Sequence, residues 1–466
     1  MPRFVFLYTD AVIWAIVLAL VLYAHHAAKT PELAAKWKKL TGNTTALFCA
    51  GLLSVFFAVA LADSVHFRPR LDVGPTGVVA YAPKTVSALD YFVGRHIAGT
   101  ERSYSAPFAL FDFDKTSALV DQKPVRRFAR LKGASPDVAP EDKAQALVTG
   151  FARGATAGLG LSCLLLGVFT LLRRQKGERL SQSIRRLTGS QNPLSPILWV
   201  WTGAFFVAGL LWELWPFWHI FGTDAVGNDV LLSAVKSVRT GVVIGSLATA
   251  CMLPPAVFLG IAAGYFKGCV DGVIQYIYTT ITSIPSVLLI AASVLMIQVF
   301  IDTNPSLYQT GLERADLRLF SLSVIIGVTS WAGLARLLRA ETMKLSEVDF
   351  IAAAKAFGVS PVRIMARHIF PNVAHIVLIV AVLDFSGIVL YEAVLSYVGV
   401  GVDPAMASFG SMINSAASEM GRSPTVWWNL AASLLFMVSL VLSANLFASG
   451  VREVFDPRAK KERSRA

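Results

Sequence analysis

Two carboxylates inside an apolar stretch are the side chains of this 466-residue chain most suited to chemistry. Asp384 and Glu392 lie within, or at the end of, one such stretch, where an unpaired charge costs about 2.5–3.5 kcal/mol at the centre of a bilayer. Acidic residues in such positions are functional candidates by default. Asp384 has two equally supported roles, lining a transport pathway and pairing with a residue on another helix. For Glu392, a hydrogen-bonding role in helix packing is the simpler interpretation.

Other patterns that carry chemistry are missing from the sequence. The chain has no Gly-Lys dipeptide, so it lacks the phosphate-binding loop GxxxxGK[ST] that an ATPase needs. It has no HExxH pattern, its seven histidines are dispersed, and its cysteines form neither a CxxC pair nor a cluster with histidine. We therefore expect no catalysis, no metal and no cofactor on this chain. The four cysteines are expected to be buried apolar thiols: Cys49, Cys163, Cys251 and Cys269.

The composition indicates a membrane protein. Hydrophobic residues make up 55% of the chain and charged residues only 15%, whereas a soluble domain has about 25% charged residues. A bilayer core about 30 Å thick is crossed by about 20 apolar residues in a helix. Stretches of this kind lie near 11–24, 45–62, 155–172, 197–217, 241–265, 276–300, 319–335, 373–395 and 426–448. The sequence therefore predicts an all-α polytopic membrane protein with about nine transmembrane helices.

The distribution of Lys and Arg predicts the orientation. Basic loops follow the first, third, fifth and seventh apolar stretches and close the chain, and short loops rich in Lys and Arg stay in the cytoplasm. This places the C-terminus in the cytoplasm and the N-terminus outside, and it explains the net charge of +12 without nucleic-acid binding. A cleaved signal peptide at the first stretch is a minor alternative. Arg3 is the only basic residue of the n-region, and the acidic Asp10 precedes the apolar run.

The segment 63–146 is a polar loop on the predicted outer side. It contains several prolines, charges of both signs and scattered Tyr and Phe residues. A purely disordered linker carries fewer aromatic residues, so we expect a small ordered element here.

The cytoplasmic segment after the seventh stretch is built like two short helices joined by a glycine. Ser346 is placed to cap the first helix, and Gly358 fits the left-handed position at its C-terminus. Ser360 is placed to cap the second, with Pro361 in its first turn and Pro371 near its end. Two short helices with an Ala-rich face can lie in a groove on a partner protein, because small side chains permit close approach of the backbones. On spacing alone, an ordinary surface helical hairpin is an equal alternative.

This segment resembles the coupling loop of permease subunits of binding-protein-dependent ABC importers. The family pattern is E-A-A, three residues, a glycine, then a hydrophobic position and a late proline. Ala352 stands where the family has Glu. The resemblance implies that the residues of the ATPase-coupling loop are Ala353, Ala354, Gly358, Ile364 and Pro371.

Three further stretches resemble the branch of this family that imports dipeptides, oligopeptides and nickel. The stretch 219–230, H-I-F-G-T-D-A-V-G-N-D-V, is similar to H-P-L-G-T-D-x-x-G-R-D-V, with Asn228 in place of Arg. The stretch 392–402, E-A-V-L-S-Y-V-G-V-G-V, and the stretch 445–458, N-L-F-A-S-G-V-R-E-V-F-D-P-R, match two later motifs. The four motifs occur in the family's order, and the resemblance corresponds to its six-helix core.

The resemblance implies a permease subunit of an ATP-driven importer in the bacterial inner membrane, with peptides or oligopeptides as cargo. The implied partners are a second permease subunit, two cytoplasmic ATPase subunits and an extracytoplasmic solute-binding protein. ATP and Mg²⁺ are expected on the ATPase subunits.

Nothing before residue 195 resembles the family. The expected divisions are an N-terminal extension with three transmembrane helices at 1–175, a basic cytoplasmic linker at 176–195, the permease core at 196–458 and a basic cytoplasmic tail at 459–466. Gly154, Gly158 and Gly160 allow close helix packing in the extension. We expect an accessory module that touches the binding protein or another outer partner and whose removal leaves assembly intact. An insertion with only a stabilising role is the alternative that stays open.

Two other classes of protein compete with the importer hypothesis. An ion-coupled secondary transporter would use Asp384, with Glu392 as a second candidate, and it should show inverted repeats with interrupted helices. We find no convincing internal repeat. A membrane receptor would sense its ligand through the loop 63–146, but this hypothesis leaves the four motifs unexplained.

Overall fold

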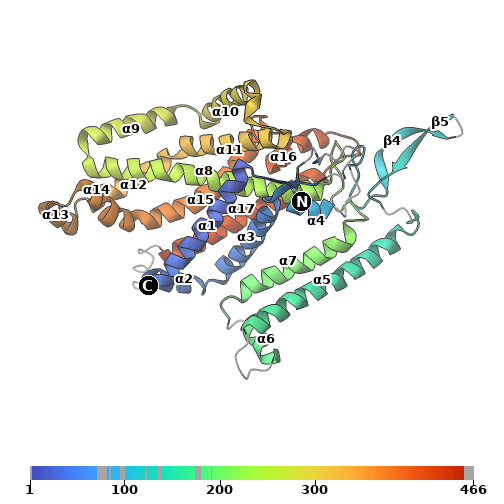
Figure 1. Cartoon of the computed structure of the whole chain (residues 1–466), viewed down its shortest axis with the longest axis horizontal. Coiled ribbons are helices and arrows are strands. Elements are labelled where there is room, and N and C mark those ends of the chain that lie inside the picture. The colour runs from blue at the N-terminus through green and yellow to red at the C-terminus, as the bar shows by residue number, and fades with distance from the viewer. Residues whose placement is uncertain are drawn as a thin grey trace. The chain divides into compact units, whose positions relative to one another are not determined.

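The computed structural model describes residues 3–70, 81–82, 85–94, 100–120, 123–134, 138–173, 180–189 and 192–455. In this part of the chain, nine helical spans are long and apolar enough to cross a membrane (Figure 1). They are α1 (Tyr8–Lys29), α3 (Thr44–Asp63), α5 (Lys143–Arg173), α7 (Ser195–Leu214), α8 (Val230–Phe266), α10 (Ser286–Thr303), the pair α11 (Gly311–Ser330) and α12 (Ala332–Leu345), the span Pro361–Tyr397, and α17 (Trp428–Phe455). The predicted fold class is confirmed. The predicted tail 459–466 and part of the linker 176–195 lie outside the described residues.

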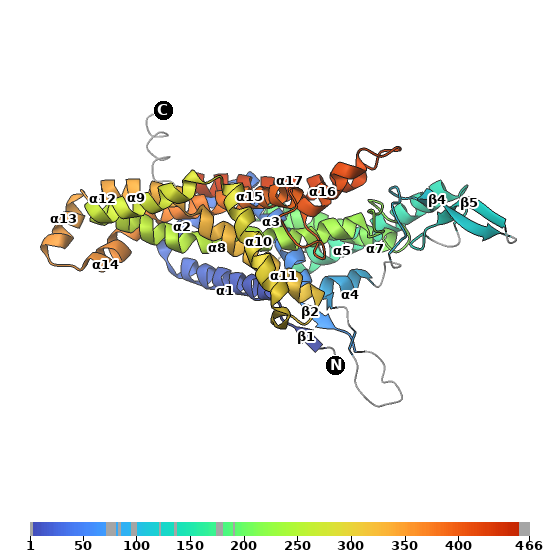
Figure 2. The same ribbon diagram turned by 90° about the horizontal axis from the view of Figure 1, so that it is seen from above.

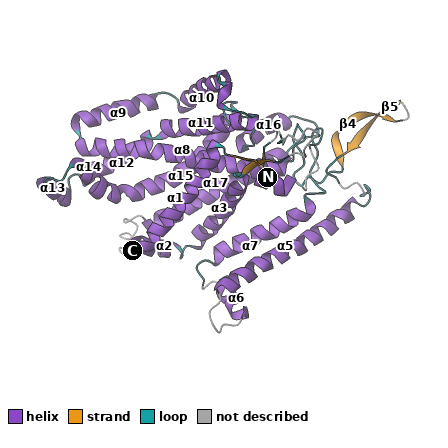
Figure 3. Cartoon of the chain, in the orientation of Figure 1, coloured by secondary structure: helices purple, strands orange, loops and turns teal. Residues whose placement is uncertain are grey.

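The other labelled elements are the three parts of the span Pro361–Tyr397 (α14, η2 and α15), further helices and the strands (Figure 3). The helices are α2 (Pro31–Leu40), α4 (Ala88–Gly94), α6 (Leu180–Thr188), α9 (Gly268–Ser283), η1 (Pro305–Leu307), α13 (Asp349–Ala356), α14 (Pro361–Ile364), the π-helical turn η2 (Met365–Ile369), α15 (Phe370–Tyr397) and α16 (Phe409–Glu419). The strands are β1 (Arg3–Val5), β2 (His66–Arg68), β3 (Val86–Ser87), β4 (Phe111–Val120) and β5 (Lys123–Arg130).

The span predicted at 276–300 is wrong in its boundaries. The chain forms α9 and α10 there, separated by Ile284 and Pro285. Ile284 is extended, with φ −88° and ψ 131°, which is the conformation that a following proline imposes on the preceding residue. The apolar pattern continues through this break, so hydropathy alone cannot detect it.

The predicted ordered element in the segment 63–146 is confirmed. Strands β1, β2 and β3 form one antiparallel sheet, and β4 and β5 form a separate antiparallel hairpin. Helix α4 follows β3 directly.

The chain divides into two compact units that interleave along the sequence. The first consists of Met1–Phe6, Lys38–Thr240 and Ala407–Ser443; the second consists of Leu7–Trp37, Gly241–Met406 and Ala444–Ala466.

In the first unit, α5 packs along α7, and α3 also packs against α7. A Cβ atom on Gly158 would lie 2.4 Å from the Phe206 carbonyl oxygen, and one on Gly154 would lie 3.1 Å from Leu210. These two glycines therefore permit close contact between α5 and α7, as predicted. The prediction is wrong for Gly160, because a Cβ atom on this residue would meet no described atom within 4 Å.

In the second unit, an apolar cluster lies where α8, α9, α12 and the segment 351–373 meet. Helix α1 also belongs to this unit and packs on α11. The backbone amide of Thr9 donates to Asp316 Oδ2 at 3.2 Å, and the Thr9 hydroxyl donates to the same carboxylate.

The prediction of four buried thiols is only partly correct. Cys49 is buried and Cys251 is partly buried, whereas Cys163 and Cys269 are exposed on the protein surface. An apolar face of a membrane helix is accommodated by lipid as well as by protein. The sequence therefore does not reveal which apolar residues face inward.

Candidate functional site

The helical loop between α12 and α15 is the first candidate site, and it begins differently from its prediction. Ser346 still belongs to the end of α12, because its backbone amide donates to the Thr342 carbonyl at 2.8 Å. Its hydroxyl donates to the Met343 carbonyl at 2.8 Å. Helix α13 starts at Asp349 without a side-chain cap. Ser346 is therefore not a capping residue of α13.

Gly358 ends α13 in the predicted left-handed conformation, with φ +71°. The Gly358 amide donates to the Lys355 carbonyl at 3.0 Å, and the Val359 amide donates to the Ala354 carbonyl at 3.1 Å. This pair of hydrogen bonds is the Schellman motif, which satisfies carbonyls that a helix end leaves unpaired. No described atom lies within 4 Å of a Cβ placed on Gly358, so the glycine is required by backbone conformation and not by crowding.

The second helix of the loop does not end near Pro371. Pro361 begins α14 as predicted, and Ser360 precedes it but makes no capping hydrogen bond with its side chain. Helix α14 continues through η2 into α15, where Pro371 occupies the first turn. A π-helical turn widens the helix locally. This geometry accommodates Pro371, which has no amide hydrogen to donate.

The loop presents one face to the protein and another to solvent. Ile351 and Ile364 are fully buried and Ala354 is buried, all within the cluster formed with α8, α9 and α12. Phe357 is 87% exposed and Val362 is 70% exposed. Ala353, Gly358 and Pro371 are also exposed.

A cation anchors α13 to the end of α8. The Lys355 ammonium lies 4.8 Å from the centroid of the Tyr265 ring, a cation–π contact. Lys267, which follows α8, forms an ion pair of 3.1 Å with Glu347, which follows α12. The loop is therefore a compact helical element, and its exposed tip carries the apolar side chains of Phe357 and Val362.

The two predicted intramembrane acids lie on α15 and have different surroundings. Glu392 is buried, and its carboxylate accepts a hydrogen bond from Ser396 Oγ at 2.6 Å. Ser396 Oγ in turn accepts from the Val402 amide at 3.2 Å, which ties the helix end to the following turn. Asp384 is half-buried and makes no hydrogen bond or ion pair with any described residue.

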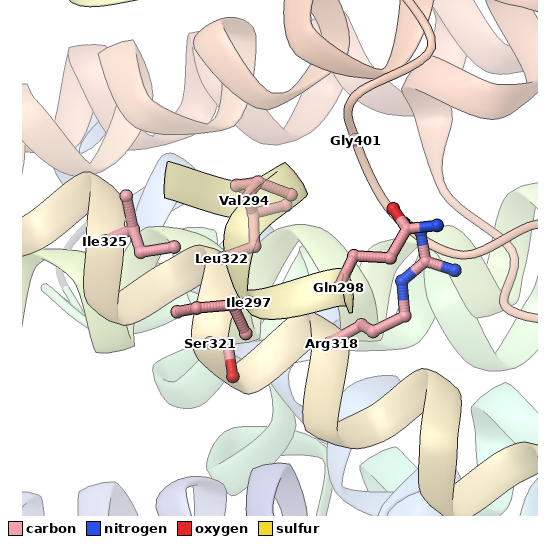
Figure 4. A pocket seen from close by; sticks show the side chains of 8 residues that line it. All are labelled: Val294, Ile297, Gln298, Arg318, Ser321, Leu322, Ile325 and Gly401. Carbon is pink, nitrogen blue, oxygen red and sulfur yellow. Dashed lines mark hydrogen bonds between the residues drawn. The ribbon is translucent and has the colours of Figure 1, made fainter. Parts of the chain in front are cut away.

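A small hollow between α10 and α11 contains a charged pair that sequence analysis missed. Arg318 donates to Gln298 Oε1 at 2.8 Å and pairs with Asp403. Figure 4 shows Gln298 and Arg318 side by side, with Gly401 on the neighbouring loop. The only sequence signal was the balance of acidic and basic residues in the loops at 302–318 and 397–425.

The segment before α8 contains a buried histidine between two carboxylates. His219 Nδ1 lies 2.8 Å from Asp229 Oδ2, and Nε2 lies 3.3 Å from Glu101 Oε1. Burial alone lowers the pKa of His219, but hydrogen bonds to both carboxylates raise it to about 9. Burial opposes ionisation of Glu101 too, yet hydrogen bonds from His219 and from the Gly133 amide keep its pKa below the usual value. His219 is therefore a buried cation at neutral pH.

The backbone around this histidine is closely packed. The Glu101 amide donates to the Gly227 carbonyl at 3.0 Å, and the Thr223 amide donates to the Ser105 carbonyl at 3.1 Å. A Cβ on Gly227 would lie 2.1 Å from the Glu101 carbonyl oxygen. Asp229 also caps α8, because its Oδ1 accepts the Leu232 amide at 2.9 Å. The motif at 219–230 thus joins the segment 101–133 to the start of α8.

These features define a polytopic membrane protein with an exposed helical loop between α12 and α15. A family model described as "Binding-protein-dependent transport system inner membrane component" matches residues 256–461. The oligopeptide transport system permease protein OppC of Escherichia coli is 30% identical over 240 residues, which cover 52% of this chain and 72% of the relative. The chain belongs to this family of inner-membrane permease proteins.

Other relatives match the same half of the chain. The dipeptide transport system permease protein DppC of Lactococcus lactis is 29% identical over 244 residues, which cover 52% of this chain and 65% of the relative, slightly less than two thirds. The oligopeptide permease protein OppC of Haemophilus influenzae is 28% identical over 241 residues, covering 52% of this chain and 71% of the relative. The N-terminal region is unmatched.

Proposed function

We propose that this chain is one of two permease subunits of an ATP-driven, binding-protein-dependent importer of peptides or oligopeptides. The observation that carries this proposal is the loop between α12 and α15. Ile351 and Ile364 anchor the loop, while Phe357 and Val362 face outward and are unpartnered by described residues. Exposed apolar side chains on a rigid element favour docking of another protein.

Two cytoplasmic ATPase subunits are the proposed occupants of this loop and of its counterpart on the second permease. ATP and Mg²⁺ bind to those subunits. Movement of the ATPases pulls on the anchored loop and, through α12 and α15, switches the pathway between inward and outward states. Ala353, Gly358 and Pro371 form the exposed part of the proposed interface, and Ala354 and Ile364 hold it in place.

The proposed orientation has the N-terminus outside and the C-terminus in the cytoplasm. It rests on the alternation of basic loops. The loop 346–372 then faces the ATPases, and the segment 63–146 faces the external solute-binding protein. The six-helix core at 196–458, the extension at 1–175 and the linker at 176–195 remain proposed divisions.

The two acids on α15 receive different proposed roles. The hydrogen bonds from Ser396 to Glu392 and from the Val402 amide to Ser396 support a local hydrogen-bonding role for Glu392 at the end of α15. Asp384 lacks a described partner, which supports a place on the pathway or at the second permease subunit.

Peptide cargo is supported by the names of the relatives from Escherichia coli and Lactococcus lactis. The test is ATP hydrolysis by the reconstituted complex, with and without a peptide-loaded solute-binding protein. We expect stimulation of hydrolysis and ATP-dependent uptake of labelled peptide. Uptake driven by an ion gradient without ATP would favour a secondary transporter, and ligand binding at the segment 63–146 without transport would favour a receptor.

A further inference from the structure

The β4–β5 hairpin is an element for which the family assignment gives no role. It extends beyond the ends of α5 and α7 in both views (Figure 1, Figure 2). Among the described strands, none pairs with an outer edge of either β4 or β5. An isolated two-stranded hairpin is marginally stable in water, and a free strand edge is available to a partner.

One face of the hairpin is cationic and aromatic. Lys115 pairs with Phe128, and Ser117 pairs with Arg126. Because side chains alternate along a strand, Lys115, Phe128 and Arg126 share one face. All three side chains are exposed, and the Lys115 ammonium lies 5.4 Å from the centroid of the Phe128 ring.

The nearby acidic residues do not neutralise this face. Asp112 is buried at the base of the hairpin. The carboxylate of Asp114 lies 3.8 Å from the guanidinium of Arg422, which is on the segment that follows α16. The face with Lys115 and Arg126 therefore presents positive charge without a carboxylate among the described residues that share it.

The base of the hairpin is fixed to the rest of the first unit. The Phe113 ring lies 5.7 Å from the Trp428 ring, and the Phe113 amide donates to the Tyr104 carbonyl at 3.2 Å. Trp428 Nε1 donates to the Thr223 carbonyl at 2.9 Å, within the segment that leads into α8. A partner held by the hairpin would thus be connected to the starts of α8 and α17.

We propose that the face formed by Lys115, Arg126 and Phe128 docks an acidic surface patch of the external solute-binding protein. The inference rests on the proposed importer function. Arg and aromatic side chains such as Arg126 and Phe128 are enriched at protein interfaces, and the positive charge of Lys115 and Arg126 attracts an acidic partner surface. A membrane surface is less suitable, because Arg127 on the opposite face leaves the ribbon without the apolar side that interfacial insertion requires.

The test measures binding of a peptide-loaded, fluorescently labelled solute-binding protein to the complete complex in nanodiscs. Lys115→Glu combined with Arg126→Glu is expected to raise Kd by about tenfold or more at low salt and to weaken the salt dependence of Kd. The matched control is Arg70→Glu, which reverses an exposed cation outside the hairpin. ATP hydrolysis without the binding protein should be unchanged in both variants. Lys115→Ala with Arg126→Ala should give a smaller loss in the same direction.

The outcomes separate this inference from the proposed function. An unchanged Kd and salt dependence in the double Glu variant would overturn the docking surface while leaving the importer intact. A loss of binding confined to nanodiscs that contain anionic lipid would also overturn it, because the face would then recognise lipid headgroups. If no peptide-loaded binding protein stimulates hydrolysis by the unmodified complex, the proposed function itself fails.

Discussion

His219 has a structural role that depends on its charge. A buried cation between two carboxylates is stabilising only while all three groups remain ionised and hydrogen-bonded. Glu101 contributes one carboxylate from the segment 101–133, and Asp229 contributes the other from the cap of α8. Both carboxylates bind the same imidazole. The positive charge of His219 therefore links two distant parts of the sequence.

We predict that this stabilisation decreases in alkaline solution. Because the folded pKa of His219, about 9, lies above the ordinary 6.5, its contribution is fully present below pH 6.5 and is lost as the pH rises through 9. His219→Gln should lower the melting temperature at pH 7, since removing one partner of a buried charge cluster costs about 3–5 kcal/mol. Melting curves of the complex from pH 6 to 10 test this. A difference between the two proteins that stays constant up to pH 10 would contradict it.

Gly358 provides a second prediction at the scale of one residue. Gly358→Val forces a β-branched side chain to adopt φ +71°, at a cost of about 1–3 kcal/mol. No neighbouring atom crowds the position, so the effect arises from the backbone. We expect normal insertion, weaker co-purification with the ATPases and reduced transport. Gly358→Asn is the matched control, because Asn tolerates the left-handed region. Full transport by the Val variant would exclude the proposed role of this turn.

At the scale of elements, two prolines explain what sequence analysis could and could not predict. Pro285 interrupts an apolar run and separates α9 from α10, whereas Pro371 is accommodated within a continuous helical span. The difference comes from the π-helical turn before Pro371 and the extended Ile284 before Pro285. Hydropathy describes neither arrangement, and the low helix propensity of proline does not distinguish the two positions. The left-handed Gly358 was predictable because its signal is local.

The exposed tip of the helical loop yields a prediction about docking. Phe357 is 87% exposed, so Phe357→Ala should leave the stability of the isolated permease nearly unchanged. If the ring inserts into an ATPase groove, its loss should weaken docking by about 1–2 kcal/mol, or roughly 5- to 30-fold in affinity. Binding of purified ATPase to permease in nanodiscs measures this. Phe258→Ala, at a similarly exposed position on α8, is the control. Equal affinities for both variants would argue against an interface at the tip.

At the scale of the whole molecule, the resemblance identified the family, but it gave no information on how the N-terminal region packs. The unmatched region contributes Thr9, which bonds the buried Asp316, and Glu101, which bonds His219. No motif contains either pair, because each joins residues more than 100 positions apart. Only the folded chain brings them together. These buried contacts of Thr9 and Glu101 argue against the expectation that the N-terminal region is a detachable module.

These contacts yield a prediction for a truncated chain. Removing residues 1–175 would take away the Thr9 hydrogen bonds to Asp316, which has no solvent exposure, and one of the two carboxylates around His219. A buried carboxylate or imidazolium that loses its partner destabilises the folded state. We therefore expect the chain starting at Lys176 to assemble poorly with the second permease and to melt at a lower temperature. Size-exclusion chromatography and co-purification measure assembly.

A less drastic pair of changes separates these contacts from the loss of three membrane helices. Glu101→Gln with Thr9→Val keeps every helix and removes only the Glu101 charge and the Thr9 hydroxyl, while the Thr9 amide still donates to Asp316, so it should reproduce part of the fall in melting temperature. Deleting only 459–466 is the control, because that tail contributes none of these contacts. Unchanged assembly and melting of the truncated chain would show that the region before residue 176 is a detachable module. In that case the contacts of Thr9 and Glu101 contribute little to the stability of the permease.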